Sequence, residues 1–200
     1  MFQRDRFIED CRSAVSEGQK AVRELVLEAV ADPAGIMSEL GEPIQAGVFP
    51  VYRADDLTII NFIWAPCMTL LPHNHNMFAV IGIYSGREDN IFWRRINEGS
   101  SDTKGPGIEA AGADSMGPGQ AVTLGKDIIH SVANPLAQHT SAIHVYGGNF
   151  FEPPHPRSQW DHESLIEQPW DMEHTRAVFR EAENRFNAGQ AAEKGSPALS

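Results

Sequence analysis

The sequence predicts a mainly β protein, an antiparallel sandwich or barrel with a helical segment at each end. From about residue 46 to residue 151, short runs of β-branched and aromatic residues alternate with clusters of Gly, Pro, Asn and Asp, as in successive antiparallel strands. Residues 1 to about 31 and a segment near residue 172 instead carry apolar residues at helical spacing. With 200 residues, 42% hydrophobic and 22% charged, the chain suits one globular domain with a sizeable core.

The N-terminal segment, residues 1–45, is predicted to be helical. Its apolar residues recur every three or four positions, at Phe7, Ile8, Cys11, Val15, Val22, Leu25, Val26 and Ala29. Asp32-Pro33 and Gly35 then interrupt the pattern. We expect the β-domain to follow this segment.

The β-domain, residues 46–151, contains runs of strand composition at Leu57–Trp64, Phe78–Tyr84, Asn90–Ile96, Ala121–Leu124, Asp127–Asn134 and Ser141–Tyr146. The Gly-rich segment Gly105–Gly119 is predicted to be irregular structure that links two halves of a barrel. Residues 152–200 are predicted as a Pro- and His-rich loop, a helix from about Met172 to Phe186, and a mobile tail of small residues. All three parts are expected to form a single domain over residues 1–200.

Charge and cysteine content exclude several functions. The formal net charge of −11 argues against binding to nucleic acid or to an anionic membrane, because both require a basic surface. No apolar run approaches the length of a membrane span, and the N-terminus lacks a signal-peptide core. The two cysteines, Cys11 and Cys67, predict no disulfide framework, and Cys67 is expected to be a small buried residue. A cytoplasmic location is the default expectation, and a homo-oligomer stays open.

A histidine pair in the β-region suggests a metal site. His73 and His75 are separated by one residue, so both side chains point to the same side of an extended strand. His130 lies in the strand-like run Asp127–Asn134 and is a third candidate ligand. Neutral imidazoles suit iron, zinc, copper and nickel, and three of them leave coordination positions open for catalysis. No carboxylate occurs among residues 76–80, so a two-histidine-one-carboxylate triad is not formed locally.

The segment around this pair resembles the first metal-binding motif of the cupin superfamily. Its spacing is His73-x-His75-x3-Ala79-x6-Gly86, with Ala79 where most cupins have a glutamate ligand. The resemblance implies the cupin double-stranded β-helix, a jelly-roll barrel. Cupins that lack the glutamate and keep three histidines include the thiol dioxygenases, namely cysteine dioxygenase and 3-mercaptopropionate dioxygenase.

Further segments also resemble the thiol dioxygenases. His130-x3-Asn134 is similar to the second cupin motif and to the strand that carries the third ligand in that family. The segment Ala142–Asn149 resembles their Ser-x-His-x-Tyr segment, with Ala142 in the place of the serine. The resemblance covers roughly Val51–Asn149.

The resemblance implies roles for five residues. His73, His75 and His130 would hold Fe(II). Tyr146 would place its phenol near the substrate and O2, and His144 would orient Tyr146 through a hydrogen bond.

Two arginines are candidates for binding a substrate carboxylate. Arg53 occupies about the place of the arginine that serves this purpose in the cysteine enzymes, although an ordinary surface ion pair explains it equally well. The mercaptopropionate-type enzymes draw their arginine from the segment after the tyrosine strand, where Arg157 is the candidate. A guanidinium suits either role because it forms two parallel hydrogen bonds to a carboxylate.

The function implied by the resemblance is an Fe(II)-dependent dioxygenase that adds both atoms of O2 to a small mercapto-acid and produces a sulfinate. Its partners would be the thiol and O2. Two alternatives stay open because a fold does not determine a reaction. One is a three-histidine cupin that cleaves a carbon–carbon bond or hydrolyses its substrate. The other is a metal-binding cupin without catalysis.

Overall fold

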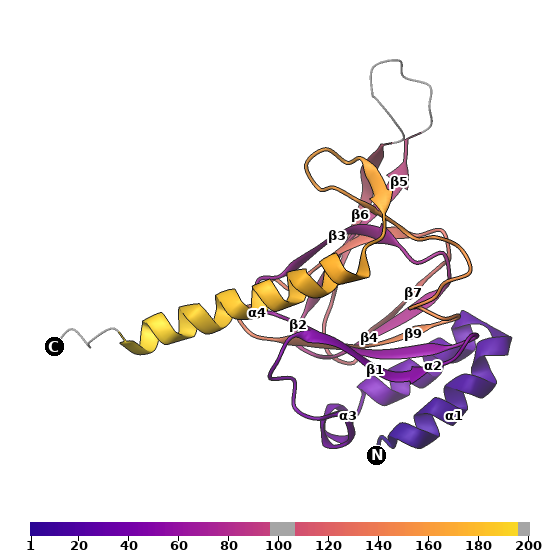
Figure 1. The fold of residues 1–200 in the computed structure, drawn as a ribbon. Helices are drawn as coiled ribbons and strands as arrows, with labels where there is room; N and C mark the ends of the chain where they lie inside the picture. The colour runs from indigo at the N-terminus through magenta and orange to yellow at the C-terminus, as the bar shows by residue number, and fades with distance from the viewer. Residues whose placement is uncertain (97–106, 196–200) are drawn as a thin grey trace.

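Two antiparallel β-sheets face each other in the computed structural model, which describes residues 1–96 and 107–195 (Figure 1). The first sheet has the strand order β1-β2-β9-β4-β7, and the second has the order β11-β10-β3-β8-β5-β6. The strands are β1 Gly47–Arg53, β2 Thr58–Trp64, β3 Thr69–Asn74, β4 Ala79–Ser85, β5 Glu88–Arg95, β6 Ile108–Met116, β7 Ala121–Leu124, β8 Ile129–Ala133, β9 Thr140–Tyr146, β10 Ser158–Trp160 and β11 Glu167–Pro169. The helices are α1 Arg4–Ala14, η1 Val15–Glu17, α2 Gln19–Val30, α3 Pro33–Leu40 and α4 Met172–Gly195.

The strand order identifies a jelly roll. The eight strands β2 to β9 divide into two four-stranded sheets, β2-β9-β4-β7 and β3-β8-β5-β6, and the chain crosses repeatedly from one sheet to the other. This is the topology of the double-stranded β-helix found in cupins. The predicted mainly β, cupin-type fold with helices at both ends is therefore confirmed.

The first sheet is covered on both faces. Its inner face contributes Phe62 and Trp64 to the core between the sheets, and its outer face packs Ile59 and Val80 against the N-terminal helices. Every residue of β2 is consequently buried, which explains its continuous apolar run. None of the helices in the described part of the chain is long and apolar enough to cross a membrane.

The N-terminal segment forms two α-helices, joined by η1, and then a third. The first break comes at Gly18, whose φ of +99° is accessible mainly to glycine. The residues predicted to interrupt the pattern also start α3, because the Asp32 side chain accepts a hydrogen bond from the amide of Gly35 and Pro33 is the first helical residue.

Three predictions need correction. Gly105–Gly119 is not irregular, because Ile108–Met116 forms the edge strand β6, while Gly105 lies outside the described residues. Helix α4 continues past Phe186 to Gly195, because its last turns contain helix-forming Ala, Gln, Glu and Lys, so only residues 196–200 of the expected tail lie outside the described part. Cys67 is exposed, since it occupies a turn with φ of +54°, whereas Cys11 is buried, and both are free thiols.

The close packing of α2 on β4 yields a testable prediction. A Cβ at Gly82 would lie 2.4 Å from Cγ1 of Val26 and 2.9 Å from Cγ1 of Val30. We expect Gly82→Ala to reduce the free energy of unfolding by about 1–3 kcal/mol, because the helix must move away from the sheet. Chemical denaturation measures the change. Gly112→Ala on β6 is the control, since nothing lies within 4 Å of its Cβ position. Equal effects of the two substitutions would contradict this account.

Candidate metal centre

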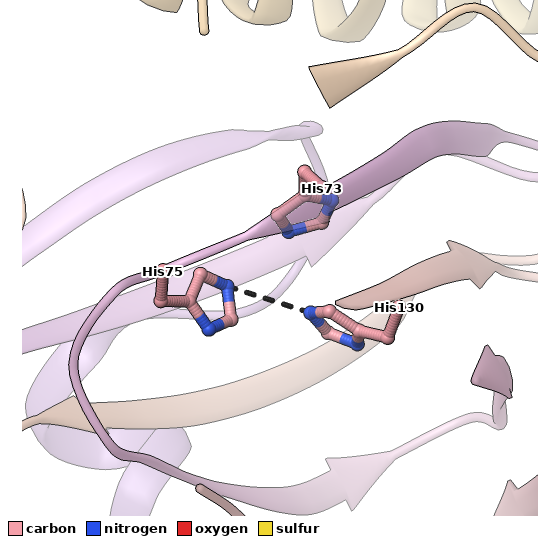
Figure 2. A group of neighbouring side chains, drawn as sticks. All are labelled: His73, His75 and His130. Carbon is pink, nitrogen blue, oxygen red and sulfur yellow. Dashed lines mark hydrogen bonds between the residues drawn. The ribbon is translucent and has the colours of Figure 1, made fainter. Parts of the chain in front are cut away.

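The pairing of β3 with β8 brings the three candidate histidines together. His73 on β3 lies directly opposite His130 on β8, and His75 follows just after the end of β3. All three side chains are buried, and each offers a nitrogen within 4.8 Å of the others' (Figure 2). The structure thus groups the residues that the sequence predicts as metal ligands.

Hydrogen bonds orient two of the three rings. Nδ1 of His73 donates to the backbone carbonyl of Leu71 at 2.9 Å, and Nδ1 of His130 donates to Oδ1 of Asn90 at 2.7 Å. Both rings therefore keep the Nε2 lone pair free for a metal ion, which is the usual role of such bonds. Nε2 of His130 lies 3.4 Å from Nε2 of His75, so two potential ligand atoms face each other (Figure 2).

Burial keeps these imidazoles in the neutral form that binds metals. Desolvation lowers the pKa of His73 to about 4. It also lowers the pKa of His75 and of His130 well below the usual value, and neighbouring imidazoles add to the effect. Because protons do not compete at neutral pH, the cluster fits a divalent ion that prefers nitrogen ligands. Ala79, opposite Tyr146 on β9, supplies no carboxylate to the set.

Tyr146 and His144 lie beside the cluster on β9. The phenol oxygen of Tyr146 is 2.9 Å from Nδ1 of His144, which is the hydrogen bond expected between them. The ring centroid of Tyr146 is 5.1 Å from that of His75. Burial raises the pKa of Tyr146, so its hydroxyl stays protonated.

Arg157 is buried near the cluster. Its carbon Cζ lies 4.1 Å from the ring centroid of Phe150 and 4.8 Å from that of Trp170, so aromatic faces hold the guanidinium. Neither Nε nor Nη1 has a hydrogen-bond partner among the described residues. Burial lowers the pKa of Arg157 to about 10, which leaves it charged at neutral pH, and this charge contributes to the lowered pKa of His73.

The spacer residues of the histidine motif anchor the segment around Arg157. Oδ1 of Asn74 accepts a hydrogen bond of 2.8 Å from the amide of Ser158. Nδ2 of Asn76 donates to the carbonyl of Pro156. The segment of residues 73–76, which carries two metal-ligand candidates, is therefore bound directly to the residues on either side of Arg157.

Arg53 lies in a different environment. Its side chain is 43% exposed and forms an ion pair of 2.8 Å with Glu152. Neither arginine is among the residues that line the cavity above the histidines, but Phe150 and Trp170, which contact Arg157, are. Of the two arginines predicted from the sequence, the structure thus brings only Arg157 next to the cluster.

The cavity itself is mostly apolar. The three histidines, His144 and Tyr146 meet apolar walls that include residues of the first sheet and the segment leading into α4. The latter are Trp170, which precedes α4, and Met172 and Thr175, which lie in the first turn of α4. Walls of this kind exclude water from the histidines.

Sequence reasoning missed Glu88 and Asn90 on β5. Both are buried, at 0% and 1% exposure, and Oε1 of Glu88 accepts a hydrogen bond of 2.9 Å from Nδ2 of Asn90. Their spacing indicates that they share one face of β5, because two polar residues at alternate positions of a strand point to the same side. The sequence alone does not tell whether that side is the core or the solvent.

Several solved structures show distant similarity to this chain. A protein with a double-stranded β-helix domain from Klebsiella pneumoniae is 11% identical, with a TM-score of 0.38 over 52% of this chain and 78% of that one. A cupin superfamily protein from Desulfitobacterium hafniense is 12% identical, with a TM-score of 0.39 over 52% and 79%. An RmlC-like cupin from Methanocaldococcus jannaschii is 10% identical, with a TM-score of 0.39 over 54% and 84%. A scan against protein-family models finds no match. The fold assignment therefore rests on the strand order.

We expect the purified chain to bind one divalent transition-metal ion, and His130→Ala to weaken that binding by at least about 100-fold, because it removes a ligand. Titration with Zn(II) or Co(II) against a competing chelator measures the affinity. His155→Ala, at an exposed position, is the control and should bind like the wild type. Unchanged affinity in a folded His130→Ala protein would show that the third ligand is misassigned.

The lowered pKa values predict how the metal-free protein responds to acid. The unfolded state takes up protons on these histidines near the ordinary pKa of 6.5, whereas folded His73 does so only near 4. Stability is therefore complete above pH 6.5 and is lost as the pH falls towards 4, by about 1.4 kcal/mol for each unit of pKa displacement. Thermal unfolding in chelator should show this loss. His75→Asn should reduce the pH dependence and His155→Asn should not; the same dependence in all three proteins would refute the assignment.

Proposed function

We propose that this protein is an Fe(II)-dependent dioxygenase that converts the thiol of a small mercapto-carboxylic acid, of the cysteine or 3-mercaptopropionate type, to a sulfinate. The reaction joins R–SH and O2 to give R–SO2H, so sulfur loses four electrons, O2 accepts them, and no further reductant is needed. The buried Arg157, beside a three-histidine cluster in an apolar cavity, is the observation that carries this proposal.

Arg157 would bind the carboxylate end of the substrate. Its Nε and Nη1 atoms are buried donors without partners among the described residues, and a buried donor left unpaired costs free energy. A carboxylate would satisfy both donors with parallel, charge-assisted hydrogen bonds. The aromatic faces of Phe150 and Trp170 hold the guanidinium plane in place for that contact.

Charge supports an anionic substrate. A divalent ion at the histidines and the buried Arg157 nearby would together contribute three positive charges in largely apolar surroundings, and the buried Glu88 carboxylate would offset one of them. A substrate with a thiolate and a carboxylate carries two negative charges and would bring the sum to zero. A neutral diketone or ester would leave that charge uncompensated, so the charge balance favours a thiol substrate over a neutral one.

The remaining residues would orient the reactants and exclude water. Fe(II), held by His73, His75 and His130, would supply the activation of O2 and lower the pKa of the thiol. Tyr146, anchored by His144, would present its phenol oxygen to the reacting atoms. The apolar walls and the segment entering α4 would keep bulk water away from the oxidised sulfur.

Oxygen consumption by the Fe(II)-loaded protein tests the reaction. We expect 3-mercaptopropionate or L-cysteine to consume O2 and yield a sulfinate in equal amounts. Cysteamine, a thiol without a carboxylate, should react far more slowly, and acetylacetone should not react. Turnover of acetylacetone or of an ester without sulfinate from any thiol would favour a different three-histidine reaction. Stoichiometric metal binding with no turnover at all would favour a binding protein.

Substitution of the two arginines tests the carboxylate site. Arg157→Gln should reduce kcat/KM for the mercapto-acid by about 100-fold or more, mainly through KM, because a buried charge partner is lost. Arg53→Gln should change it by less than about 3-fold, since Arg53 pairs with an exposed glutamate. The opposite ranking of the two variants would assign the carboxylate to Arg53.

A further inference from the structure

The buried carboxylate of Glu88 lies between the metal-ligand candidate His130 and the hydrogen-bonded pair His144 and Tyr146. Its side chain is 0% exposed at the start of β5. Oε1 accepts the hydrogen bond from Asn90, while Oε2 lies 3.9 Å from Nε2 of His144. Neither Oε2 nor that Nε2 has a hydrogen-bond partner among the described residues. Burying a charged group costs free energy unless other groups compensate it. The two groups that can compensate Glu88 are its neighbours Asn90 and His144.

One branch runs from Glu88 to the metal-ligand candidate His130. Nδ2 of Asn90 donates to Glu88, and Oδ1 of Asn90 accepts the Nδ1 hydrogen of His130. Because the amide is engaged at both ends, it cannot turn over without losing both bonds. Glu88 thereby holds the orientation that directs Nε2 of His130 towards His75.

The other branch runs from Glu88 through His144 to Tyr146. An ionised carboxylate only accepts hydrogen bonds and attracts positive charge, so it favours a proton on the ring nitrogen that faces it. At 3.9 Å the contact is electrostatic rather than a hydrogen bond. A neutral His144 with its proton on Nε2 has its lone pair on Nδ1, and the hydroxyl of Tyr146 must then donate to that atom.

We propose that Glu88 is a positioning residue that orients the ligand His130 through Asn90 and selects the His144 tautomer that makes Tyr146 a hydrogen-bond donor to His144. The consequence for Tyr146 is directional: its proton points to His144, and its oxygen lone pairs face the cavity. The role of this arrangement in catalysis rests on the proposed function, whereas the effects on His130 and on the tautomer do not.

Glu88→Gln separates the two branches. Its amide oxygen can replace Oε1 as the acceptor for Asn90, and its amide nitrogen then faces Nε2 of His144 as a donor. The variant should therefore keep the hydrogen bonds from residue 88 through Asn90 to His130. It should reverse the contact with His144 and move the His144 proton to Nδ1. Asn90→Leu cuts only the first branch. Asp89→Asn is the matched control, because Asp89 is the next residue on β5 and pairs with Arg87 and Ser115 on the surface.

Nitrogen NMR of the Zn(II)-loaded proteins reports the tautomer without any turnover. We expect the His144 proton on Nε2 in the wild type and in Asp89→Asn, and on Nδ1 in Glu88→Gln. A proton on Nδ1 in the wild type, or no change in Glu88→Gln, would overturn the tautomer assignment. The wild-type measurement alone decides the case if Glu88→Gln does not fold.

Metal affinity tests the other branch. Asn90→Leu should weaken Zn(II) binding by about 10- to 100-fold, as loss of a bond to a ligand histidine usually does. Glu88→Gln and Asp89→Asn should bind within about 3-fold of the wild type. Wild-type affinity in a folded Asn90→Leu protein would overturn this branch. If no thiol is oxidised but these results hold, the proposed function fails while the role of Glu88 stands.

Discussion

The site depends on an irregularity in the pairing of β3 with β8. Leu70 lies opposite Val132, and His73 lies opposite His130, so three steps along β3 match two steps along β8. This is a bulge, and it coincides with Pro72, which has no amide hydrogen to donate. Leu70 and His73 both line the cavity although they are an odd number of residues apart. Without the bulge, side-chain alternation would turn the two histidines of the motif away from His130.

Once the three imidazoles meet, burial governs their chemistry. Desolvation favours their neutral forms, and the same low polarity strengthens the effect of the nearby charges Arg157 and Glu88. Each of these charged groups would be unfavourable alone in such surroundings. Arg157 is offset by aromatic faces, and Glu88 by contacts with Asn90 and His144. Under the proposed function, both belong to a site that receives a cation and an anionic ligand.

The fold is predictable from the sequence where the type of each side chain indicates whether it is buried. The run of β2, buried on both faces, is recognisable from its composition, as is the histidine pair from its spacing. Strand β6 gives no such signal, because its residues between the two ends are exposed and its pairing with β5 uses the backbone. Propensity and periodicity cannot identify a strand that is held by its neighbour.

The same limit applies to the site. The three metal-ligand candidates come from a recognisable motif, but Arg53 and Arg157 look equally suitable in the sequence. What separates them is tertiary: Arg157 is buried against two aromatic rings, while Arg53 is 43% exposed and reaches an exposed partner, Glu152. Glu88 is missed for a related reason, since a carboxylate two residues after a turn glycine, Gly86, normally suggests a surface position.

The motif His73-Asn74-His75-Asn76 links the ligand cluster to the arginine without an intervening flexible segment. Its histidines belong to the cluster, and its asparagines bind the backbone of Pro156 and Ser158, on either side of Arg157. A short segment and two hydrogen bonds therefore connect the metal-ligand candidates to the backbone around Arg157. Under the proposed function, this short connection selects substrates by the distance between thiol and carboxylate. A longer mercapto-acid would have to bend or give up one of its two contacts, and the apolar walls offer its carboxylate no substitute for Arg157.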